Sequence, residues 1–62
     1  MSVICNANAL YNFQAQNPDE LSLSKGDTLE VLLKHEDDWW LVRNRHGQEG
    51  LIPSNYVYAE LK

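Results

Sequence analysis

The sequence predicts a small all-β domain, a five-stranded barrel of two packed antiparallel sheets. Apolar and polar residues alternate over short runs, turn residues separate these runs, and no stretch repeats apolar residues at helical spacing. A chain of 62 residues has room for one domain, 1–62, with one core. Closing short strands into a barrel also limits the number of unpaired strand edges.

The alternating runs predict five strands, at residues 7–12, 28–34, 39–44, 48–53 and 57–60. A long polar loop follows the first strand, because residues 14–20 read QAQNPDE and contain an Asn-Pro turn signal. Gly26 serves a tight turn that needs a positive φ. The segment Arg45-His46-Gly47 joins two strands as a hairpin. Pro53 lacks the ladder N–H, so residues 53–56 should form a short 3-10 turn before the last strand.

One parity of these runs supplies a predicted aliphatic core. Each fully buried large aliphatic side chain in it contributes about 1.5–3 kcal/mol, enough for a modest domain. The lone Cys5 cannot form an intrachain disulfide, and we interpret it as a small apolar residue near the first strand. A reduced thiol favours a cytoplasmic location. The predicted core comprises Ala7, Ala9, Leu21, Leu23, Leu29, Val31, Val42, Ile52 and Val57.

The charge balance excludes several classes of function. Five basic residues stand against nine acidic ones, a net charge of −4, which argues against nucleic acid and an anionic membrane surface and favours a basic partner. No apolar run approaches the roughly 20 residues that span a bilayer. Cys5, His35 and His46 lie far apart in sequence, and the acids cluster in exposed loops. We therefore expect no metal, no cofactor and no catalysis.

The aromatic residues are the informative remainder. Trp40 shares the parity of Val42 on the packed side, so Trp39 faces the other way. Tyr11, Phe13 and Tyr56 can meet Trp39 on one exposed strip, and contiguous apolar patches mark interaction sites. Acidic residues flank this strip, at Asp19, Glu20, Asp37 and Asp38.

Such a strip suits an apolar ligand that carries a basic residue. A polyproline II segment is stiff before it binds, and its prolines fit between aromatic ridges. Two other interpretations stay open. The rings could form a cage that binds methylated lysine by cation–π attraction. Alternatively, the domain could be purely structural or self-associating, which would leave Trp39 buried.

The motifs in their order resemble the Src homology 3 (SH3) family over residues 6–60. Residues 9–13 (ALYNF) resemble its ALYDY motif, residues 19–23 (DELSL) the acidic end of its long first loop, and residues 25–27 (KGD) its diverging turn. Trp39-Trp40 resembles its tandem tryptophan. Residues 50–57 (GLIPSNYV) resemble its closing motif.

The resemblance implies an SH3-like barrel that acts as an adaptor module, a monomer that binds PxxP-type segments of other proteins or of its parent chain. Tyr11 and Tyr56 would wall one proline pocket, and Trp39 and Pro53 would join them in the next. Glu20 would meet a ligand Arg or Lys beside Trp39 and the acidic loops, while Asn55 and the Trp39 indole N–H would donate hydrogen bonds to ligand carbonyls. Phe13 stands where the family often has Tyr, so it keeps the apolar wall but lacks the hydroxyl. Leu51 stands where many relatives have an aromatic residue, and this departure concerns the flanking preference.

Overall fold

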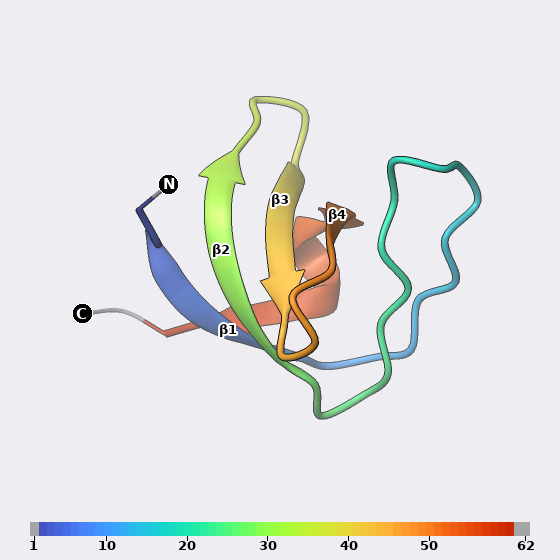
Figure 1. Cartoon of the computed structure of the whole chain (residues 1–62), viewed down its shortest axis with the longest axis horizontal. Helices are drawn as coiled ribbons and strands as arrows, with labels where there is room; N and C mark the ends of the chain where they lie inside the picture. Colours follow the sequence, from blue (N-terminus) through green and yellow to red (C-terminus); the bar gives the residue numbers. More distant parts are fainter. Residues whose placement is uncertain (1, 61–62) are drawn as a thin grey trace.

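The computed structural model describes residues 2–60, so residues 1 and 61–62 of the predicted domain lie outside the described part (Figure 1). Five antiparallel strands form one sheet in the order β4-β3-β2-β1-β5. A single 3-10 turn, η1, precedes the last strand, as predicted. The elements are β1 (Cys5–Ala9), β2 (Thr28–Lys34), β3 (Trp39–Asn44), β4 (Glu49–Pro53), η1 (Ser54–Tyr56) and β5 (Val57–Ala59).

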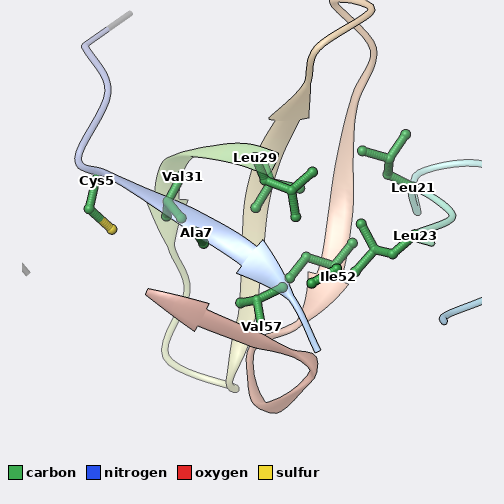
Figure 2. Close-up of a cluster of buried hydrophobic side chains, with 10 residues drawn as sticks. Cys5, Ala7, Leu21, Leu23, Leu29, Val31, Ile52 and Val57 are labelled. Carbon is green, nitrogen blue, oxygen red and sulfur yellow. The ribbon is translucent and has the colours of Figure 1, made fainter. Parts of the chain in front are cut away.

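Ten buried side chains form one cluster, which contains every predicted core residue and Cys5 (Figure 2). Leu29, Val31, Val42 and Ile52 are at most 1% exposed. They are the largest fully buried side chains and lie on β2, β3 and β4, whereas the buried positions of β1 hold only small residues, Cys5, Ala7 and Ala9. The interpretation of Cys5 as a small buried apolar residue is confirmed.

The first strand differs from the prediction at both ends, since it begins at Cys5, two residues earlier, and ends at Ala9, three residues earlier, rather than spanning 7–12. Cys5 pairs with Val31, which extends the ladder toward the N-terminus. At the other end, the Ala9 carbonyl accepts a hydrogen bond from Gly26 N–H (2.8 Å), and the next N–H, of Leu10, turns to the Tyr56 carbonyl (2.8 Å). The chain therefore leaves the sheet at Leu10 and begins the long loop.

The β2 strand contains a register shift that the sequence reading missed. The shift lies between Val31 and Leu33. It places the neighbouring side chains of Val31 and Leu32 both in buried positions, whereas Leu33 is 45% exposed. A bulge adds one residue to a strand and so breaks strict alternation, which explains why alternation alone did not identify Leu32 as buried.

The turns agree with the predictions. Gly26 and Gly47 have φ angles of 93° and 80°, in the region that glycine adopts without steric cost. The β3–β4 turn and the loop between β2 and β3 lie at opposite ends of β3 (Figure 1). The predicted long loop extends to one side of the sheet, and its tip returns to β4.

Candidate functional site

Four aromatic rings from distant parts of the chain form a continuous row of contacts. Tyr11 meets Tyr56 with ring centroids 5.7 Å apart. Phe13 lies 5.6 Å from Tyr56 and 6.1 Å from Trp39. All three pairs have edge-to-face geometry, with interplanar angles of 71–80°. Rings held edge to face are splayed rather than stacked flat, so they form a ridged surface.

Backbone pairing brings these rings together. The Leu10 N–H donates to the Tyr56 carbonyl, which sets Tyr11 beside η1. Trp39 opens β3 and pairs with Pro53, the last residue of β4. Phe13 is held by the opposite arm of the long loop. Its backbone N–H donates a hydrogen bond to the Leu23 carbonyl (3.0 Å), and its carbonyl accepts one from the Leu23 N–H (2.8 Å). The predicted strip of Tyr11, Phe13, Trp39 and Tyr56 therefore exists as one surface.

The rings differ in how far they face water. Tyr11 is 58% exposed, whereas Trp39, Pro53 and Tyr56 are half-buried. Phe13 is half-buried and packs against the core, so it supports the other rings more than it offers a face. Trp40 also packs against the core, which agrees with its predicted parity. A purely structural role predicted that Trp39 would be sealed inside, and it is not.

An open pocket of about 500 Å³ continues the row beyond Trp39. The long loop contributes one wall, the loop between β2 and β3 the other, and Leu51 of β4 lies between them. Three of the lining side chains are carboxylates, so the pocket is strongly acidic. Its lining residues are Asn17, Asp19, Glu20, His35, Asp37, Trp39 and Leu51.

The tip of the long loop is docked on β4 by the backbone. The Leu51 N–H donates to the Asp19 carbonyl (2.8 Å), and the Leu21 N–H donates to the Leu51 carbonyl (3.1 Å). Gly50 permits this approach. A Cβ on Gly50 would lie 2.8 Å from both Cβ and N of Leu21, and 2.9 Å from the carbonyl carbon of Glu20. No side chain fits at position 50 unless the loop moves.

The Glu20 carboxylate is turned back onto its own loop. It accepts hydrogen bonds from the backbone N–H groups of Gln16 (2.7 Å) and Asn17 (3.3 Å), and from the Asn17 side-chain amide (2.8 Å). These donors favour the ionised form, so the bond from the Gln16 N–H, followed by that from the Asn17 side chain, holds the pKa of Glu20 below its ordinary value of 4.5. Glu20 thus closes the loop as well as adding charge to the pocket.

The remaining predicted residues take different positions. Asp19, Asp37 and Leu51 line the pocket, whereas Asp38 does not. Asp38 has a φ of 65°, and its carbonyl accepts a hydrogen bond from the Ser54 N–H (2.9 Å). It therefore connects the short loop to η1. Asn55 is exposed in η1, beside Tyr56.

Sequence reasoning missed two residues of the pocket, Asn17 and His35. Asn17 was assigned to the long loop and His35 to a charged loop, and neither belongs to a pattern that marks a site. Their place depends on the two loops meeting across β4, which no local signal reveals.

Residues 2–60 contain no group of three or more His, Cys, Asp or Glu side chains that could hold a metal ion. The same part of the chain has no helix with the length and apolar character needed to cross a membrane.

The comparisons with known proteins agree on one family. The SH3 domain family model matches residues 8–54. Among solved structures, the C-terminal SH3 domain of myosin IB from Entamoeba histolytica, bound to a peptide, is 44% identical with a TM-score of 0.86, and the match covers 98% of this chain and 100% of that one. The chain belongs to the SH3 family, whose domains are non-catalytic protein-interaction modules.

The curated relatives are much longer proteins. Proline-serine-threonine phosphatase-interacting protein 1 from Homo sapiens is 59% identical over 49 residues, which span 79% of this chain and 12% of that protein. The actin cytoskeleton-regulatory complex protein SLA1 from Mycosarcoma maydis is 51% identical over 51 residues, 82% of this chain and 4% of that protein. The similarity to these two relatives therefore concerns one domain within much longer chains.

Proposed function

We propose that this domain binds proline-rich segments in the polyproline II conformation and prefers those that carry a flanking Arg or Lys. The observation that most directly supports this proposal is the row of splayed rings that ends in an acidic pocket. A polyproline helix is already extended and lacks internal hydrogen bonds, so it pays little ordering entropy when its ridges enter the spaces between rings.

The prolines lie along the rings in this proposal. Tyr11 and Tyr56 flank one proline site, and Tyr56, Pro53 and Trp39 flank the next. Donors matter as much as rings, because the ligand's carbonyls have no partner within a polyproline helix. The Trp39 indole N–H and the exposed Asn55 amide supply such donors, and they fix the register of the ligand along the row.

The ligand's basic residue enters the acidic pocket. Within residues 2–60, no hydrogen bond to the protein occupies the Asp19 or Asp37 carboxylate, whereas Glu20 accepts three. We therefore assign the direct ion pairs to Asp19 and Asp37. Glu20, which is bonded to its own loop, adds its negative charge to the pocket. Leu51 contacts the aliphatic stem of the basic side chain. Each exposed pair contributes about 0.2–1 kcal/mol, so the pocket sets orientation more than total affinity.

The domain, taken as residues 1–62, acts as a monomeric adaptor in the cytoplasm, within signalling or cytoskeletal assembly. The relatives support the cytoskeletal direction, since one of them is a component of an actin cytoskeleton-regulatory complex. The partner segment lies on another protein or on the parent chain.

A titration tests the proposal. Amide chemical shifts are followed by NMR while a PxxP peptide with one flanking Arg is added. The expected dissociation constant is micromolar, which corresponds to a binding free energy of about −8 kcal/mol or weaker. The shifts should follow the ring row and the pocket. Trp39→Ala should abolish binding while the domain stays folded. A methyl-lysine peptide that perturbs Trp39, with no response to the proline peptide, would instead establish the aromatic cage.

A charge variant tests the pocket separately. Asp37→Asn should weaken the Arg peptide by about two- to fivefold at low salt, and less at high salt. Glu60→Gln removes one charge at the far end of the chain, where Glu60 accepts a bond from Asn8 (3.5 Å). It should leave the affinity unchanged. Equal losses in both variants would mean that only net charge matters.

A further inference from the structure

His35 is the one lining residue of the acidic pocket that can become a cation. It follows the end of β2, in the loop that forms the second wall, and its backbone N–H donates a hydrogen bond to the Trp39 carbonyl (3.0 Å). The residue is exposed, so its side chain is open to water. A histidine side chain changes charge between pH 5 and 8, in contrast to the carboxylates around it.

The charges around His35 come from both walls. Asp19 and Glu20 contribute from the long loop, and Asp37 from its own loop. The neighbouring charges in sequence are Glu36 and Lys34, and the Lys34 ammonium lies 4.6 Å from the centre of the Trp40 ring. Three carboxylates and one ionisable imidazole line the same pocket, so protonation of the imidazole changes the local charge from −3 to −2.

We propose that His35 makes recognition of a basic ligand residue depend on pH. This inference rests on the proposed function. Neutral His35 leaves the full acidic field to the ligand's Arg or Lys, whereas protonated His35 competes for the same carboxylates and repels the incoming cation. Binding of the cation therefore displaces a proton from the imidazole, because ligand and proton oppose each other at one site.

The chain provides its own control. It has only two histidines, His35 and His46. His46 lies in the β3–β4 turn, at the other end of β3 from the pocket. At about 3.3 Å per residue, the length of β3 separates the two histidines by about 17 Å. The hydrogen bonds described above hold the pKa of Glu20 below its ordinary value. A binding change between pH 7.5 and 5.5 that is lost in His35→Gln and kept in His46→Gln therefore reports His35.

The test uses two histidine-free PxxP peptides that differ only in the flanking position, Arg or norleucine. From pH 7.5 to 5.5 the Arg peptide should bind about two- to threefold more weakly, the effect of one like charge several ångströms away in water. The norleucine peptide should bind equally at both values. His35→Gln should remove the pH effect, and His46→Gln should retain it.

A second measurement does not depend on small affinity differences. Calorimetry at pH 6.5 in two buffers of different ionisation enthalpy should show net proton release when the Arg peptide binds the wild type, and none with His35→Gln. Affinity that is independent of pH, or a decrease that survives in His35→Gln, overturns the role of His35. If neither peptide binds at pH 7.5, the proposed function fails instead.

Discussion

The long loop, residues 10–27, and the short loop, residues 35–38, form the two walls of the acidic pocket but are held very differently. The long loop buries Leu21 and Leu23 in the core and pairs with β4 through Leu51. Side chains also bind its backbone, since Ser22, Asp27 and Asn12 accept hydrogen bonds from N–H groups within it. The short loop has four exposed residues and is attached mainly at its ends.

The two walls of the pocket therefore differ in how firmly they are held before a ligand binds. The wall formed by the long loop is set before a ligand arrives, so little entropy is lost there on binding. The short loop carries Asp37 and His35 on a segment with few contacts, and such segments belong to the low-stability end of a fold. We expect the first wall to fix the position of the ligand and the second to adjust to its charge.

The largest expected effect breaks the attachment of the long loop. Gly50→Ala places a Cβ against the backbone of residues 20 and 21, which no rotamer change relieves. Unfolding in urea should show a loss of about 1–3 kcal/mol, the usual cost of overpacking, and the Arg peptide should bind much more weakly.

Gly47→Asn is the matched control. A Cβ at Gly47 meets nothing within 4 Å, and asparagine tolerates the positive φ found there. Stability should change little and peptide binding not at all. Wild-type stability and binding in Gly50→Ala would show that the loop does not depend on the close approach.

A smaller effect concerns the closure of the long loop by Glu20. The folded state lowers the pKa of this carboxyl, so its contribution to stability is present above the unfolded value near 4.5 and is lost as pH falls through the lower folded value. Glu20→Gln should therefore be less stable than the wild type at pH 6, and the difference in melting temperature should narrow toward pH 3.

Asp19→Asn distinguishes a specific bond from general charge. The Asp19 carboxylate accepts no hydrogen bond from residues 2–60. The difference in melting temperature between Asp19→Asn and the wild type should therefore not narrow toward low pH as it does for Glu20→Gln. Hydrogen exchange provides a second readout, because the amides of Gln16 and Asn17 should exchange faster in Glu20→Gln. Unchanged exchange at both amides would contradict the closure.

The smallest effect sharpens the view of the short loop. Asp38 is the one non-glycine residue with a positive φ between residues 2 and 60, at 65°. Asp38→Gly removes this local strain and should raise the free energy of unfolding by about 0.5–1 kcal/mol. Asp37→Gly, which relieves no such strain, should be neutral or slightly destabilising. A loss of stability in Asp38→Gly would show that the aspartate side chain stabilises the turn.

Much of the fold follows from local patterns. The alternation of Leu29 and Val31 with polar neighbours, together with the breaks at Gly26, Gly47 and Pro53, identified the strands. The opposite parity of Trp39 and Trp40 separated the surface ring from the packed ring. The errors lie where tertiary pairing overrides local pattern. Cys5 joins the first strand because β2 extends past it, and Leu32 is buried because the strand bulges.

The sequence by itself determined the core, the turns, the aromatic strip and the acidic character around it, because side-chain parity and turn chemistry act between near neighbours. Only the tertiary structure decided that Glu20 bonds to its own loop and that His35 lies within the pocket. Both depend on chain segments that meet across β4, and such long-range contacts leave no periodic trace in the residues that make them.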